Sequence, residues 1–183
     1  MSSDLIPPVA FLPQDAHGLR GRLAFCPAPG RWRHDSPLEP ERMLGADLAC
    51  LRDTCGAAVL VTLLEEGEMW TIGLGGLLDG ARRAGLESLW FPIRDGTAPS
   101  DAGETGRLVG RILEHLAAGR TVVIHCHGGI GRSGTVAACC LVAAGQDPRR
   151  AIELVRQAQP AAASAPGQEE FVHEFARAAR SRG

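Results

Sequence analysis

Apolar residues along the chain form short runs, and between the runs they recur every three or four positions. Three of the runs predict buried β-strands at residues 57–64, 86–93 and 121–124, and the weakly alternating residues 21–26 could form a first strand. The periodic segments predict helices at residues 41–52, 77–84, 102–118, 136–144, 148–156 and 168–180. This alternation predicts an α/β fold with a single central, mostly parallel sheet flanked by helices, and a site beyond the carboxyl ends of the strands.

The length and charge of the chain fit one domain and restrict its partners. We expect a single domain over residues 1–183, with the proline-interrupted residues 1–20 as an arm or an edge element. Hydrophobic residues make up 45% of the chain, and its formal net charge is −2. The hydrophobic content predicts a well-formed hydrophobic core. The small net charge predicts neither nucleic acid nor a membrane as a partner. No secretory signal or apolar span is visible, so we expect a cytoplasmic protein.

The six cysteines do not have the spacing of a metal site. No two of them form a Cys-x2-Cys pair, and His125, Cys126 and His127 are consecutive, which is poor geometry for binding one metal ion. We therefore expect no metal and no organic cofactor.

Residues 121–134 combine a strand, a glycine-rich turn and the start of a helix. Backbone N–H groups converge at such a junction, and the helix dipole adds partial positive charge, so the segment favours binding of an anion. Cys126 opens the turn and Arg132 follows six residues later. A thiol beside N–H donors and a guanidinium ionises readily, and the guanidinium fork matches two phosphate oxygens. A buried structural cysteine is the alternative, but it would leave Arg132 and the three glycines unexplained.

The sequence His125-Cys126-x5-Arg132-Ser133 resembles the signature loop of the cysteine-dependent protein tyrosine and dual-specificity phosphatases. The resemblance implies their fold, a thiolate nucleophile at Cys126 and a cysteinyl-phosphate intermediate. We call residues 126–132 the signature loop. Residues of this loop are expected to bind the phosphate: His127, Gly128, Gly129, Ile130, Gly131 and Arg132.

Cleavage of a phosphate ester also needs a general acid that protonates the leaving oxygen. Asp95 is the best candidate, because it follows a predicted strand within a Gly/Pro loop, and the resembling family has its acid at such a place. An ordinary turn residue before Gly96 is the alternative. Asp101 is a rival acid, but its spacing to Glu104 suits a helix cap.

Further roles follow from the resemblance. Ser133 would hydrogen-bond the departing sulfur; the alternative role is to cap the following helix, and it could have both roles. His125 would orient the loop and assist thiolate formation, or be a satisfied buried histidine. His127 could face the substrate or the solvent. Gln168 could orient the attacking water, although a helix-start residue is the simpler interpretation.

A narrower resemblance links residues 91–99, 125–133 and 171–175 to the cyclin-dependent-kinase-associated dual-specificity phosphatases. It implies a phosphorylated protein as the substrate, with a kinase as one candidate, and we expect the enzyme to be a monomer. The loop lacks lysine, which disfavours a polyphosphorylated lipid. The short chain predicts a shallow site open to phosphotyrosine and to phosphoserine or phosphothreonine.

Other classes of protein remain open at this point. A rhodanese-like sulfurtransferase also uses a cysteine loop, and a phosphate-binding module would keep Arg132 without needing Cys126. A redox sensor could pair Cys126 with another cysteine, for which the candidates are Cys50, Cys55 and Cys139.

Overall fold

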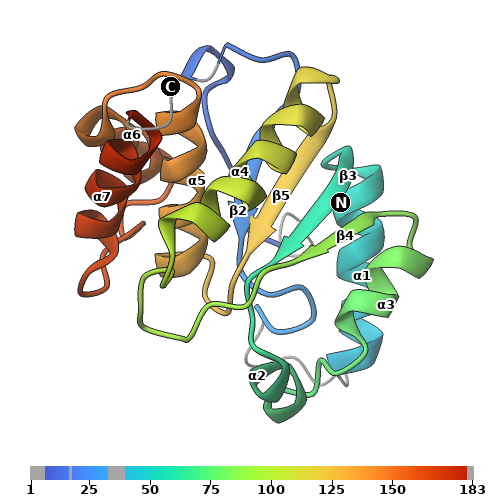
Figure 1. Ribbon diagram of the computed structural model, residues 1–183. Coiled ribbons are helices and arrows are strands. Elements are labelled where there is room, and N and C mark those ends of the chain that lie inside the picture. Colours follow the sequence, from blue (N-terminus) through green and yellow to red (C-terminus); the bar gives the residue numbers. More distant parts are fainter. Residues whose placement is uncertain (1–6, 17, 33–39, 181–183) are drawn as a thin grey trace.

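The computed structural model describes residues 7–16, 18–32 and 40–180. Within these residues one sheet has five strands in the order β1-β2-β5-β3-β4 (Figure 1). The strands are β1 (Ala10–Phe11), β2 (Leu23–Cys26), β3 (Ala57–Thr62), β4 (Glu87–Trp90) and β5 (Thr121–His125). Only β1 is antiparallel to its neighbour, so the predicted mostly parallel sheet is confirmed.

Helices cover both faces of this sheet. They are α1 (Pro40–Asp53), α2 (Glu66–Thr71), α3 (Leu77–Arg83), α4 (Ala102–Ala117), α5 (Gly131–Ala143), α6 (Pro148–Ala158) and α7 (Gln168–Arg180). Successive strand residues point to opposite faces, which divides the interior into two cores. Phe25, Val61 and Ile124 pack beneath α4 to α7, and Ala24, Leu60 and Val123 pack beneath α1 and α3.

Several boundaries differ from those that the sequence predicts. The run 86–93 forms a strand only as far as Trp90. Beyond it the N–H of Phe91 donates to the carbonyl of Thr62, but that of Ile93 donates to the carbonyl of Leu63, so the regular register with β3 ends. Helix α5 begins at Gly131, five residues before the predicted start, so Arg132 and Ser133 belong to its first turn. This turn consists of glycine and polar residues, so the spacing of apolar residues did not indicate it. Most of the polar stretch 31–40, between the predicted strand 21–26 and the predicted helix 41–52, lies outside the described residues.

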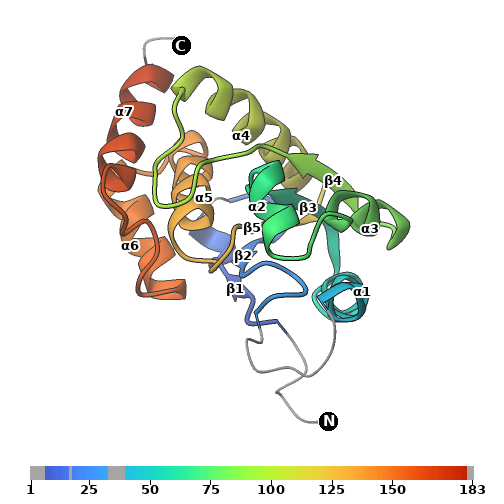
Figure 2. The same ribbon diagram turned by 90° about the horizontal axis from the view of Figure 1, so that it is seen from below.

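The carboxyl ends of β5, β3 and β4 open onto one edge of the sheet. Seen from this edge, α2 and the first turn of α5 lie on either side of the end of β5 (Figure 2). Chain segments that are far apart in sequence therefore meet where the signature loop leaves β5.

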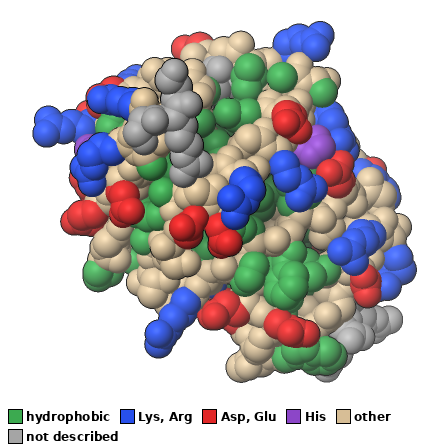
Figure 3. Space-filling view, viewed as in Figure 1, with side chains coloured by type: hydrophobic (Ala, Val, Ile, Leu, Met, Phe, Trp, Pro, Cys, Tyr) green, Lys and Arg blue, Asp and Glu red, His purple; other side chains and the backbone are tan. Residues whose placement is uncertain are grey.

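The described surface carries charges of both signs. On the face shown in Figure 3, the arginine side chains are interspersed with aspartate and glutamate, and no broad cationic area forms among the described residues there. None of the helices among the described residues has the length and hydropathy of a membrane-spanning segment.

Asp101 caps the amino-terminal end of α4. Its Oδ1 accepts a hydrogen bond of 2.6 Å from the backbone N–H of Glu104. The sequence-predicted cap is therefore confirmed.

Replacing Asp101 by alanine should lower the free energy of unfolding by about 1 kcal/mol, because a helix N–H loses its acceptor. Urea denaturation measures this change. Ser100→Ala, at the exposed neighbouring position, is the control and should have little effect. Equal stability of Asp101→Ala and the wild type would contradict the role of the cap.

Candidate active site

Cys126 lies at the floor of a cavity formed where β5 meets α5. The thiol is only 3% exposed, and its Sγ lies 3.4 Å from the Oγ of Ser133. The cavity measures about 270 Å³, and its lining includes Asp95, Gln168 and five of the seven signature-loop residues, all except His127 and Gly129. Among the described residues, Ile130 is the N-cap of α5 and makes no side-chain cap hydrogen bond, whereas Ser133 lies in the first turn with its hydroxyl beside Sγ, which supports the contact with sulfur over the role of a cap.

The signature loop packs directly on the end of β2. Gly129 has a φ of 67°, and a Cβ atom there would lie 2.3 Å from the backbone carbon of Cys26. The backbone N–H of Ala28 donates a hydrogen bond of 2.9 Å to the carbonyl of His127. Only glycine fits at position 129, both for its backbone conformation and for the close approach of the neighbouring strand.

Arg132 is a buried cation whose terminal nitrogens are occupied by protein groups. It is 2% exposed, and it donates to both carboxylate oxygens of Glu68 at 2.7 and 2.8 Å. Its Nη1 also donates to the carbonyl of Ile93 at 2.9 Å, and its Nη2 lies 2.8 Å from Oδ1 of Asp95. Burial lowers the pKa of Arg132, but the hydrogen bonds that it donates to Glu68 and the negative charge of that carboxylate raise the pKa by more, so the side chain keeps its charge.

Glu68 is the residue that sequence reasoning missed at this site. It lies on α2, after the end of β3, where the sequence showed only an acidic turn. Burial raises the pKa of its carboxyl, but the hydrogen bonds and charge of Arg132 lower that pKa by more. The Nδ1 of His127 also lies 3.5 Å from Glu68. An acidic residue following the strand next to β5 was the available signal, but its partner is 64 positions away in the sequence.

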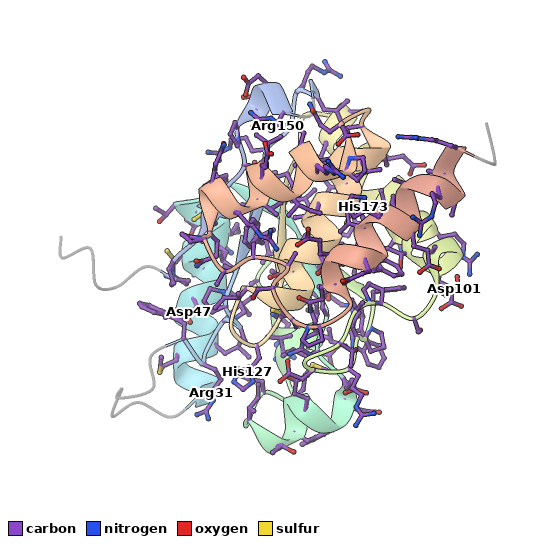
Figure 4. All side chains as sticks on the ribbon, turned by 90° about the vertical axis from the view of Figure 1, so that its left-hand side faces the viewer. Arg31, Asp47, Asp101, His127, Arg150 and His173 are labelled. Atoms are coloured by element: carbon purple, nitrogen blue, oxygen red, sulfur yellow. The ribbon has the colours of Figure 1, made fainter. Side chains whose placement is uncertain are left out.

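Asp95 reaches the cavity, whereas its rival does not. The Asp95 carboxylate is 71% exposed, and it lies at the cavity rim beside Arg132. Asp101 caps α4, and Figure 4 shows it well apart from His127 of the signature loop. Asp79 forms an ion pair with Arg82 on α3. Of these three aspartates, Asp95 is therefore the one placed beside Cys126 and Arg132.

His125 is fully buried behind the signature loop. Its Nε2 lies 2.9 Å from the hydroxyl of Thr62, and its Nδ1 lies 3.3 Å from the carbonyl oxygen of Cys126. A carbonyl only accepts, so Nδ1 carries the proton and Nε2 accepts from Thr62. Burial lowers the pKa of His125 to about 4, which makes it a neutral support of the loop backbone.

Comparison with known proteins identifies the family. The family model described as "Polymorphic toxin system, DSP-PTPase phosphatase" matches residues 42–146, more than half of the chain. The chain belongs to this phosphatase family. Rat cyclin-dependent kinase inhibitor 3 is 28% identical to it over 170 residues, which cover 91% of this chain and 77% of the rat protein. The human protein of the same name is 30% identical over 125 residues, 67% of this chain and 58% of its own length.

Solved structures agree with this assignment. A crystal structure of kinase-associated phosphatase, with its catalytic cysteine replaced by serine, has a TM-score of 0.83 and 26% identity, covering 94% of this chain and 96% of its own. Tk-PTP in its active form has a TM-score of 0.67 and 31% identity over 86% of this chain and 92% of its own. The protein is thus a cysteine-dependent dual-specificity protein phosphatase. The sulfurtransferase alternative gains no support.

The stability of the phosphatase should depend on His125 below neutral pH. The pKa of this histidine is about 4 in the folded state and about 6.5 in an unfolded chain, so between these values the unfolded state binds the proton. From pH 7 to pH 5 the free energy of unfolding should fall by roughly 2 kcal/mol on this account. His125→Asn should lack this part of the pH dependence in urea titrations. An unchanged pH dependence in the variant would contradict the burial of a neutral histidine.

Glu68→Gln should lower kcat/KM for p-nitrophenyl phosphate by about tenfold. A neutral amide binds the buried Arg132 guanidinium less firmly than the carboxylate does, so the orientation of the guanidinium is less well fixed. Glu66→Gln, on the same helix but exposed, is the matched control. Wild-type kinetics in Glu68→Gln would show that Arg132 does not depend on this partner.

Proposed function

We propose that the protein hydrolyses phosphotyrosine and phosphoserine or phosphothreonine esters through a cysteinyl-phosphate at Cys126. One arrangement carries the proposal: the Cys126 thiol lies at the floor of a cavity, with a buried Arg132 in its wall and the Asp95 carboxylate at its rim. A nucleophile, a phosphate-binding cation and an acid thus surround one space.

In the first step the Cys126 thiolate attacks phosphorus as the P–O bond to the leaving group breaks. The N–H groups of the signature loop and Arg132 bind the equatorial oxygens. Protonated Asp95 gives its proton to the departing oxygen, so the leaving group departs as an alcohol or phenol.

In the second step a water molecule attacks the phosphorus and the P–S bond breaks. Asp95, now a carboxylate, takes the proton of the water. The Ser133 hydroxyl, at 3.4 Å from Sγ, donates a hydrogen bond to the departing thiolate. The products are inorganic phosphate and the regenerated thiolate.

The phosphate is expected to contact the loop residues His127, Gly128, Gly129, Ile130, Gly131 and Arg132. His125 supports this loop from behind through the Cys126 carbonyl. His127 lies on the Glu68 side of the loop, where its ring is partly exposed. This position favours contact with the group next to the phosphate.

The substrate class is proposed from the site and from the names of the relatives. The cavity is small, and the exposed Asp95 turn forms its rim, which suits both short and long phosphorylated side chains. Two related proteins have kinases in their names, which favours a phosphorylated kinase as the substrate. A working thiolate requires a reducing setting, which favours the cytoplasm.

The decisive experiment compares the wild type, Cys126→Ser and Asp95→Asn on p-nitrophenyl phosphate from pH 5 to pH 8, and on matched phosphotyrosine and phosphothreonine peptides. Cys126→Ser should be inactive, because the hydroxyl ionises too weakly to attack. Asp95→Asn should lose about 10²-fold in kcat, and its activity should no longer fall on the alkaline side of the profile.

Asp79→Asn is the matched control and should behave as the wild type. Retained activity in Cys126→Ser would exclude the thiolate mechanism. An unchanged alkaline limb in Asp95→Asn would exclude Asp95 as the acid. Turnover of the phosphotyrosine peptide alone would exclude dual specificity.

A further inference from the structure

The side chain of Gln168 is a buried amide that joins two loops. It is the first residue of α7 and is 0% exposed. Its Oε1 accepts a hydrogen bond of 3.0 Å from the backbone N–H of Ala165. Its Nε2 donates a hydrogen bond of 2.9 Å to the backbone carbonyl of Thr97. Both ends of the amide are therefore used within the protein.

Thr97 closes the turn that carries Asp95. Its hydroxyl donates to the carbonyl of Arg94 at 2.9 Å, and its backbone N–H donates to the same carbonyl at 3.3 Å. On the other side of Asp95, the carbonyl of Ile93 accepts from Arg132 at 2.9 Å. The exposed aspartate thus lies between two tethers, one from Arg132 and one from Gln168.

The same amide also packs against the signature loop. A Cβ atom on Gly131 would lie 3.0 Å from Nε2 and 3.1 Å from Oε1 of Gln168. The amide therefore lies in close contact with the backbone of the first residue of α5. It also forms part of the wall of the cavity above Cys126. One side chain thus contacts both the turn that carries Asp95 and the phosphate-binding loop.

We propose that Gln168 is a positioning residue that holds the Asp95 turn at the distance required for proton transfer to the leaving oxygen. The proposal rests on the proposed function, in which Asp95 is the acid. Proton transfer needs a heavy-atom separation of about 2.6–3.2 Å, so a turn that drifts by an ångström loses much of its catalytic effect.

The sequence suggested another role for Gln168, that of orienting the attacking water. The two roles act in different steps. Asp95 acts as an acid while the cysteinyl-phosphate forms, and this step is contained in kcat/KM. Water attacks only afterwards, so its orientation affects kcat and leaves kcat/KM unchanged.

The leaving group supplies the test. Phenyl phosphate releases a basic phenolate and needs the acid strongly, whereas p-nitrophenyl phosphate releases a stable anion and needs it less. Gln168→Met keeps the length of the side chain and removes both hydrogen bonds. It should lower kcat/KM for phenyl phosphate about tenfold more than for p-nitrophenyl phosphate. Gln168→Asn, which is one carbon shorter, should show a smaller loss of the same kind.

Two comparisons complete the design. Gln157→Met, at an exposed position of α6, is the matched control and should leave both substrates unaffected. In the Asp95→Asn background, Gln168→Met should cause no additional loss that is selective for phenyl phosphate, because the acid is already absent.

Three outcomes would overturn the proposal. Equal losses in kcat/KM for both substrates would indicate a structural role only, and a loss in kcat alone, with a burst of phenolate, would indicate water orientation. A further loss selective for phenyl phosphate in the Asp95→Asn background would also contradict it. Asp95→Asn itself separates this proposal from the proposed function. If that variant shows no selective loss, the acid is misassigned. If it does and both Gln168 variants do not, only the positioning role fails.

Discussion

Burial of the Arg132 guanidinium is the constraint on which the site depends. A cation removed from water costs several kcal/mol unless charged and polar partners compensate for it. Glu68 supplies two carboxylate oxygens, Ile93 a carbonyl and Asp95 a further carboxylate. These partners follow β3 and β4, while Arg132 follows β5. One side chain therefore ties together the carboxyl ends of three adjacent strands.

The same contacts hold the shape of the site. The terminal nitrogens of Arg132 are all used, and the contact with Asp95 is the one formed by an exposed group at the cavity rim. A phosphate competes with a carboxylate for such a nitrogen, and protonation of the carboxylate weakens its hold. In the proposed reaction, the protonation state in which Asp95 can act as an acid is also the one in which it yields Arg132 most easily.

The fold could be predicted largely from apolar periodicity, because each strand and each long helix has a buried face that marks the sequence. The order of helices and strands then implied the parallel sheet. Boundaries were less certain where other chemistry dominates. The first turn of α5 contains Gly131, Arg132 and Ser133, which are polar or small residues of the site and show no apolar periodicity. Strand β4 ends before Pro92, although the apolar run in the sequence continues.

Some residues of the candidate site could likewise be predicted from the sequence, and others could not. Cys126, Arg132 and the glycines are visible in sequence because a loop that surrounds one anion must be built from consecutive residues. Glu68 and the contacts of Gln168 could not be inferred, since a bond to a residue 64 or 71 positions away depends on which strands are neighbours. Asp95 lay between these cases, because the strand before it showed where the turn would be. Local sequence therefore specifies the groups that react, and topology supplies those that hold them in place.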